Sequence, residues 1–284
     1  RADKACARAR EAGGNGVEVY QQGVGERAAE GAGGGHDLTR VITAALEAGR
    51  LVPCYQPIVP LRDLDGERYQ AAVRLETEAG ETIPASDFMP TAFKRGLVER
   101  IDRFVLDRVL EVLAERRAAG TPPRLYVHHA MVTLRSKEWI LWLRDRIVEL
   151  GLVGHAPLLV FELADVLTNL RVAHARFPVL GKLGVSVCVQ GFTDQPAAKA
   201  ILGELPISAI APAPEFTAEE KRMARLMRLV QFAHERDCRV VGTEIATPQE
   251  IARAWDCNLD LIRGPYIHPP QPLLNFDFSE AQQE

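Results

Sequence analysis

The sequence predicts an α/β protein whose main part is a TIM-like (β/α)8 barrel. Runs of β-forming residues alternate with amphipathic helical stretches, which indicates parallel strands joined by crossover helices. The helical stretches include residues 101–117 and 218–236. Eight such units favour a closed barrel over an open doubly wound sheet, although periodicity leaves the open sheet as the alternative. The candidate strands are residues 54–60, 69–76, 124–128, 158–163, 185–189, 209–212, 239–243 and 261–267.

The chain divides into a main domain and short flanking pieces. Residues 1–22 read as a helix, a glycine break and a strand, and residues 23–36 are glycine-rich like a flexible linker. Residues 37–276 hold the barrel, with Asp37 as the N-cap of a helix over residues 38–46. Residues 277–284 read as a polar tail.

The composition excludes several classes of protein. Hydrophobic residues make up 47% of the 284 residues, and the net charge of −4 gives no reason to expect nucleic-acid binding. The five cysteines lack CxxC spacing, which fits a reducing compartment. No apolar run reaches the roughly 18 residues of a membrane span. We therefore expect a cytoplasmic location and interpret the chain, which begins at Arg1, as a fragment of a longer protein.

The functional site of such a barrel lies where the strands end. The first two strands contain Tyr55-Gln56-Pro57-Ile58-Val59 and Gln70-Ala71-Ala72-Val73-Arg74. Together with Phe88-Met89-Pro90 and Leu205-Pro206, these sequence motifs resemble those of the EAL domain, the cyclic-di-GMP phosphodiesterase family. The resemblance covers residues 38–272. Residues 1–22 resemble the C-terminal end of a GGDEF domain, with a generic helix–turn–strand as the alternative.

The resemblance implies a ligand site for cyclic-di-GMP at the barrel mouth. Gln56 matches the glutamine that faces guanine, and Arg74 matches the arginine that meets a phosphate. For Gln56 the alternative is a solvated loop residue, and for Arg74 it is a surface ion pair with Glu76. The implied ligand-binding residues are Gln56, Ala72, Val73, Arg74, Asp102 and Glu162. For Asp102, stabilisation of a helix start is the alternative.

The same resemblance predicts that the catalytic metals are lost. The family's name-giving glutamate is Gln70 here, and an expected Asp pair reads Gln190-Gly191. Glutamine offers a hard cation only one neutral oxygen. His128 and His129 are adjacent, so on a strand they point to opposite faces and are poorly placed to share a metal. Further losses are the lysine motif, which reads Ala211-Pro212-Ala213, and the final glutamine, which is Arg263.

Three acids at or near the strand ends could still contact a ligand or a metal ion. Glu162 and Asp165 keep the spacing of a ligand pair, whereas Glu244 is one residue out of register and is expected to face away from the mouth unless the strand bulges. We therefore predict no catalytic metal and no enzymatic activity.

Within the family the chain resembles FimX-like proteins, through Glu67-Arg68-Tyr69, Asp102 and Leu167-Thr168-Asn169-Leu170. The resemblance implies a receptor that binds cyclic-di-GMP without cleaving it and contacts a PilZ-domain partner in type IV pilus control. Homodimerisation is a further expectation. The alternative function is a docking module that binds only proteins.

Overall fold

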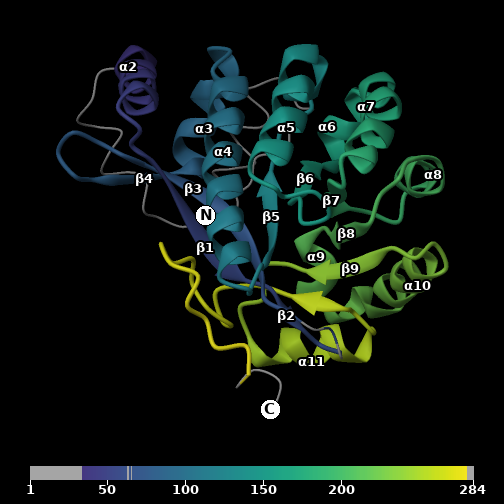
Figure 1. Cartoon of the computed structure of the whole chain (residues 1–284). Coiled ribbons are helices and arrows are strands. Elements are labelled where there is room, and N and C mark those ends of the chain that lie inside the picture. Colours follow the sequence, from purple (N-terminus) through teal and green to yellow (C-terminus); the bar gives the residue numbers. More distant parts are fainter. Residues whose placement is uncertain (1–33, 63, 65, 280–284) are drawn as a thin grey trace.

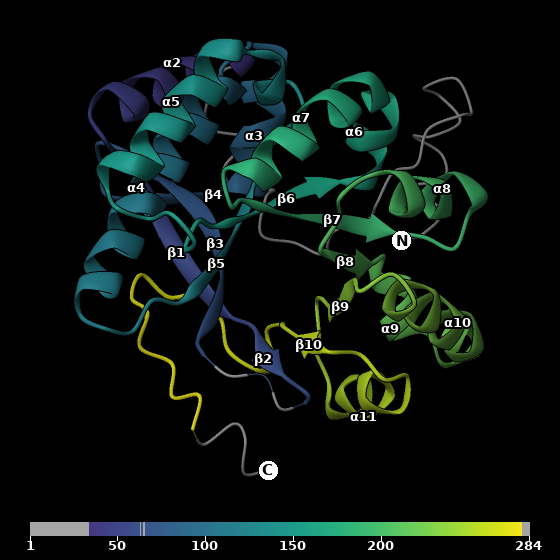
Figure 2. The same ribbon diagram turned by 45° about the vertical axis from the view of Figure 1, so that its right-hand side comes forward.

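The computed structural model describes residues 34–62, 64 and 66–279. The described part folds into a strongly curved sheet of ten strands that closes on itself, with helices around the outside (Figures 1 and 2). The prediction of a TIM-like barrel is confirmed. The strands are β1 (Leu51–Pro57), β2 (Val59–Pro60), β3 (Arg68–Glu76), β4 (Thr82–Pro84), β5 (Arg124–His128), β6 (Leu158–Glu162), β7 (Ser186–Phe192), β8 (Ala209–Pro212), β9 (Arg239–Gly242) and β10 (Leu261–Ile262).

The barrel departs from an all-parallel arrangement at its first strand. Strands β3 and β5 to β10 run parallel in chain order, but β1 pairs antiparallel with β3 and β2 pairs antiparallel with β10. The segment from β1 to β2 therefore contacts both edges and closes the sheet. The expectation of purely parallel strands is wrong here, because β1 and β3 follow each other through a short connection with no crossover helix.

Helices cover the outer surface of the sheet (Figure 2). They are α2 (Gly34–Glu47), α3 (Ala85–Lys94), α4 (Val98–Ala118), α5 (Lys137–Glu149), α6 (Leu163–Thr168), α7 (Leu170–Lys182), α8 (Pro196–Glu204), α9 (Pro214–Ala218), α10 (Met223–His234) and α11 (Pro248–Asp256). The helix expected over residues 218–236 is thus divided between α9, a 3-10 turn at Glu220–Arg222 and α10. None of the described helices is long and apolar enough to cross a bilayer.

Two hydrophobic clusters hold the barrel together. The large one lies between sheet and helices, and the small one fills the barrel interior. The interior cluster consists of Ile58, Tyr126, Val160, Cys188, Ala209, Ala211, Val241 and Leu261. Because these side chains fill the barrel, a ligand can lie only at its ends, and a second cavity of about 60 Å³ lies where β5 to β9 begin. In barrels of this kind the functional site lies at the opposite end, the mouth formed by the carboxyl ends of the strands.

Both predicted boundaries of the main domain shift in the structure. Residues 1–33 lie outside the described part, so the GGDEF-like remnant and most of the linker stay predictions. Helix α2 begins at Gly34, so residues 34–36 belong to a helix and Asp37 lies within it instead of capping it. At the other end, the described part of the expected tail is packed, since the rings of Phe278 and Tyr69 lie 5.3 Å apart. At the C-terminal end this aromatic contact is tertiary packing, which local composition does not reveal.

Candidate functional site at the barrel mouth

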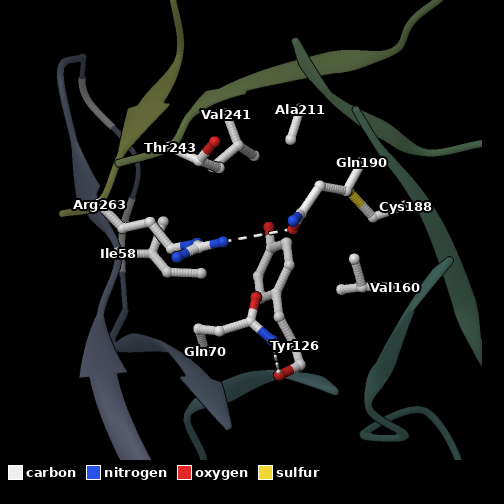
Figure 3. A pocket seen from close by; sticks show the side chains of 10 residues that line it. All are labelled: Ile58, Gln70, Tyr126, Val160, Cys188, Gln190, Ala211, Val241, Thr243 and Arg263. Atoms are coloured by element: carbon white, nitrogen blue, oxygen red, sulfur yellow. Dashed lines mark hydrogen bonds between the residues drawn. The ribbon is translucent and has the colours of Figure 1, made fainter. Parts of the chain in front are cut away.

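Inward-facing side chains from the barrel strands converge just below the mouth (Figure 3). A cavity of about 10 Å³, room for about one water molecule, lies among them. Its lining is Ile58, Gln70, Tyr126, Val160, Cys188, Gln190, Ala211, Val241, Thr243 and Arg263. The alternation along each strand places Ala72, Arg74, His128 and Glu162 on the same inward faces, nearer the mouth.

Arg263 occupies the centre of this ring of side chains. It follows β10, is only 6% exposed, and its guanidinium reaches across the barrel (Figure 3). Its Nη1 donates to Gln56 Oε1 at 3.2 Å, and its Nη2 donates to Gln190 Oε1 at 3.3 Å. Burial lowers the pKa of Arg263 and nearby Glu244 opposes that shift, but a guanidinium remains protonated in proteins. One fixed positive charge therefore ties β1 to β7 and β10.

Glu244 does face the mouth, and the expectation that it points away is wrong. Strand β9 ends at Gly242, and Glu244 adopts a left-handed conformation with φ of 59°. This turn brings its Oε1 to 3.5 Å from Arg263 Nη1, while the side chain stays 61% exposed. The strand alternation fails here because the regular strand has already ended.

Gln190 enters the site as the last inward-facing residue of β7 before a β-bulge, two residues after Cys188. The pairing of β7 with β8 shifts register between Gln190 and Phe192, and Gly191 between them has φ of 69°. The sequence analysis noted Gln190 only as a lost acid and missed its contact with Arg263. A glycine inside a strand is a signal for such a bulge.

Gln56 and Gln70 are both buried and internally hydrogen-bonded. Gln56 Nε2 donates to the His268 carbonyl at 3.0 Å, and its Oε1 accepts from Arg263. Gln70 Nε2 donates to the Tyr126 carbonyl at 3.0 Å (Figure 3). Gln70, at the position of the family's first acid, is thus a neutral side chain anchored to the barrel wall.

Arg74 is the available cation of the mouth. It lies in β3 between Val52 of β1 and Pro84 of β4, and it is partly exposed. No described residue accepts a hydrogen bond from its side chain or pairs with it, so the ion pair with Glu76 considered in the sequence is not formed. Ala72 and Val73 precede it and are also partly exposed.

Two acids that the sequence placed near the ligand hold a loop together in the structure. Asp102 is 5% exposed, and its Oδ2 accepts from Ala130 N at 3.0 Å and from Thr133 Oγ1 at 2.6 Å. Burial raises the pKa of Asp102, which His129 and these hydrogen bonds oppose. Asp165 accepts from Met131 N at 2.8 Å and from Asn169 Nδ2 at 2.8 Å. The contact of Asp102 with a ligand remains a prediction.

Glu162 and His128 complete the set of accessible groups. Both end their strands with exposed side chains that have no hydrogen-bond partner within the described ranges. Desolvation by the surrounding residues raises the pKa of Glu162, and the charge of Arg263 opposes this shift. Desolvation, together with the charge of Arg263, lowers the pKa of His128 to about 3. The mouth therefore offers a ligand the Arg74 cation, a neutral imidazole and the acidic groups of Glu162 and Glu244.

These residues do not fit a two-metal centre. A hard divalent cation takes several carboxylate oxygens, and within the described ranges no three His, Cys, Asp or Glu side chains converge as a metal site. The ring supplies the amides of Gln70 and Gln190, the methyl of Ala211 and the cation of Arg263 instead.

The fold and the site define a β/α barrel with a polar, strand-end site at its mouth. Residues 39–270 match the model of the EAL domain, so the chain belongs to the EAL domain family.

Two relatives and two solved structures illustrate the family. The chain is 32% identical over its full length to a 76.5 kDa protein from the phbC 3′ region of Thiocystis violacea, covering 41% of that protein. It is 25% identical over 236 residues to the cyclic di-GMP phosphodiesterase NbdA of Pseudomonas aeruginosa, covering 81% of this chain and 30% of NbdA. The chain thus spans less than half the length of either relative.

The fold is also that of known EAL domains. The FimX EAL domain of Pseudomonas aeruginosa bound to c-di-GMP has a TM-score of 0.80 at 23% identity, covering 85% of this chain and 99% of that one. The FimX EAL domain of Xanthomonas citri in complex with c-diGMP also has a TM-score of 0.80, at 22% identity, with 89% and 100% covered.

Proposed function

We propose that this EAL domain is a signalling receptor that binds cyclic-di-GMP without cleaving it. The observation that carries the proposal is Arg74, an arginine at the barrel mouth that has no partner among the described residues. A guanidinium in this position suits a phosphate oxygen, to which it can donate two parallel hydrogen bonds. The same fold holds c-di-GMP in the FimX EAL domains, which supports the choice of ligand.

The other mouth residues would frame the nucleotide. Gln56 retains one lone pair and one N–H for a guanine edge, since its other amide groups are used by Arg263 and His268. Ala72 would form the wall beside the phosphate, and Glu162 the opposite side. The side chain of Val73 packs on the other face of β3 against the large hydrophobic cluster, so Val73 could meet the ligand only through its backbone. Asp102 would act indirectly, because its carboxylate holds the loop at Ala130 in position beside the ligand.

The absence of cleavage is part of the proposal. Hydrolysis of a phosphodiester by metal ions requires ligands that hold the metal and a water molecule that it activates. The ring around Arg263 provides amides and a cation at those strand ends. We propose that this domain is not an enzyme, in contrast to a phosphodiesterase such as NbdA.

A receptor also needs a protein partner that responds to ligand binding. We propose that ligand binding is relayed in the cytoplasm to a protein partner of the PilZ-domain class, in type IV pilus, motility or virulence control, and that the domain forms a homodimer. Light scattering of the purified chain tests the dimer, and co-purification with a PilZ-domain protein in the presence and absence of nucleotide tests the relay.

Calorimetry with cyclic-di-GMP tests the receptor. Wild type should bind with one site per chain, and Arg74→Ala should bind about tenfold more weakly or worse, because a charge-assisted pair to phosphate is lost. Arg228→Ala is the matched control, since Arg228 is an exposed arginine on α10 and should be neutral.

Chromatography of the same mixture, with Mg²⁺ or Mn²⁺ added, should show no linear dinucleotide. No heat from wild type would refute the receptor, and linear product would refute the loss of activity.

A docking module without a nucleotide is the second candidate. It is favoured by the internal hydrogen bonds of Gln56, whose two amide groups already have protein partners. A saturable, Arg74-dependent heat of nucleotide binding would rule it out.

A further inference from the structure

The mouth contains a positive charge that belongs to the protein itself. We propose that Arg263 is a fixed cation that takes over the electrostatic role of a metal ion in this site. It keeps divalent cations out of the mouth and supplies positive charge to a phosphate of the bound nucleotide. The part concerning the nucleotide rests on the proposed function, whereas the exclusion of metals does not.

The contacts of Arg263 show how it would exclude a metal ion. Its guanidinium donates to Gln56 Oε1, Gln190 Oε1 and Glu244 Oε1, three oxygens from different parts of the barrel wall. Side-chain oxygens of this kind are the ligands that hard divalent cations use. A metal ion would have to displace the guanidinium from these oxygens and then remain close to its charge, which water screens poorly at 6% exposure.

The charge balance of the mouth leads to the same conclusion. The accessible carboxylates are Glu162 and Glu244, and the cations are Arg74 and Arg263, so the formal charges cancel. Asp102 and Asp165 are used by backbone N–H groups. A divalent cation prefers a strongly negative cluster, whereas a nucleotide phosphate prefers cations placed on both sides.

A role in stability alone is the competing interpretation. Arg263 links β10 to β1 and β7, and this link by itself would help close the barrel. That interpretation predicts that neutral substitutions lower stability without changing the response to metals or anions, so the response to each is the useful measurement.

The metal part is tested by thermal unfolding with and without Mn²⁺. Wild type should show no saturable rise in Tm beyond that of a salt control. Arg263→Gln should gain such a rise, and adding Glu162→Gln and Glu244→Gln together should abolish it, because these two are the accessible carboxylates of the mouth. Saturable stabilisation of wild type by Mn²⁺, or no gain in Arg263→Gln, would overturn the exclusion of metals.

The nucleotide part is tested by calorimetry in EDTA and in Mg²⁺. Wild type should bind cyclic-di-GMP with the same Kd in both, within about twofold, and Arg263→Gln should bind about tenfold more weakly in EDTA. Arg263→Lys keeps the positive charge but loses the planar guanidinium with its paired N–H donors. Its Kd for cyclic-di-GMP in EDTA should therefore lie between those of wild type and Arg263→Gln. Equal binding by wild type and Arg263→Gln in EDTA would refute this part. No binding by wild type would refute the proposed receptor and leave the Mn²⁺ result standing.

A second variant covers the case in which Arg263→Gln does not fold. Glu244→Gln removes an exposed carboxylate and leaves Arg263 in place. It should fold, bind the nucleotide about two- to threefold more tightly because a nearby negative charge is lost, and gain no stabilisation by Mn²⁺. Weaker or unchanged nucleotide binding would count against Arg263 as the cation that faces the phosphate.

Discussion

His129 shows how a single buried side chain links the loop at the mouth to the stability of the barrel. It is 6% exposed, its ring lies 5.3 Å from that of Trp139, and neither ring nitrogen has a hydrogen-bond partner among the described residues. Burial lowers the pKa of His129, and nearby Asp102 opposes this. Burial therefore disfavours the charged form of this imidazole in the folded protein.

The free energy of unfolding should depend on pH through His129. Below the ordinary histidine pKa of 6.5 the unfolded chain takes up a proton that the folded chain resists, so stability falls as the pH falls. His129→Phe keeps the aromatic packing and removes this titration, so it should lose less stability than wild type between about pH 7 and pH 5. Urea unfolding of both proteins across this range measures the effect.

Asp102, whose raised pKa acts in the opposite direction, is coupled to His129, so the same comparison is also made with Asp102→Asn in both proteins. Parallel stability curves for the two proteins would contradict the assignment.

At the scale of elements, the mouth depends on irregular features at the ends of strands. A bulge at Gly191 interrupts β7 directly after Gln190, and the left-handed turn at Glu244 carries that acid over Arg263. Gly264 allows the segment after β10 to run directly against Ile245, whose N–H donates to the Arg263 carbonyl at 3.1 Å. A Cβ on Gly264 would overlap the backbone of Ile245.

Gly264→Ala should therefore damage both the barrel and its site. We expect a loss of about 2–4 kcal/mol in the free energy of unfolding, because backbone would have to move, together with weaker nucleotide binding. Gly203→Ala in α8 is the matched control, since its Cβ would meet no atom within 4 Å. That change should stabilise the protein by about 0.5–1 kcal/mol. Chemical unfolding of the two variants compares them, and equal stabilities would show that the close approach is not required.

At the scale of the molecule, the site is assembled by closure of the barrel. Arg263 comes from the last strand, Gln56 from the first and Gln190 from β7, so a ligand at the mouth contacts segments far apart in the sequence. The C-terminal segment adds to this closure, because Gln271 and Tyr55 exchange backbone hydrogen bonds of 2.7 and 2.9 Å.

Binding of the nucleotide should therefore stabilise the entire domain. A ligand that binds only the folded state raises the free energy of unfolding by about 2.7 kcal/mol at a concentration of 100 Kd. For a domain of this size we expect Tm to rise by roughly 5–10 °C. Thermal unfolding with cyclic-di-GMP measures the shift, with GTP as the control nucleotide. Arg74→Ala should show a much smaller shift, and an equal shift in that variant would place the ligand elsewhere.

The sequence by itself determined the barrel, the family and the place of most strands, although the strand expected over residues 261–267 is only Leu261–Ile262 and β4 was not predicted. Strands such as β5 and β8 were predicted with their observed bounds, because β-forming runs that are buried on both faces are distinctive. The sequence motifs around Gln56, Gln70 and Arg74 identified the EAL domain. The sequence also showed which residues at the strand ends differ from the expected metal ligands.

Only the tertiary structure decided how those residues are used. Among the described residues Arg74 has no hydrogen-bond or ion-pair partner, whereas Gln56 accepts a hydrogen bond from Arg263. Asp102 and Asp165 accept hydrogen bonds from the loop at Ala130 and Met131. The tertiary structure also brought Glu244 to Arg263 through a left-handed turn that residue alternation does not encode, and it placed Gln190 within reach of the same guanidinium. Hydrogen bonds between β1, β7 and β10 depend on where the closed barrel places their ends, and local sequence carries no information about that distance.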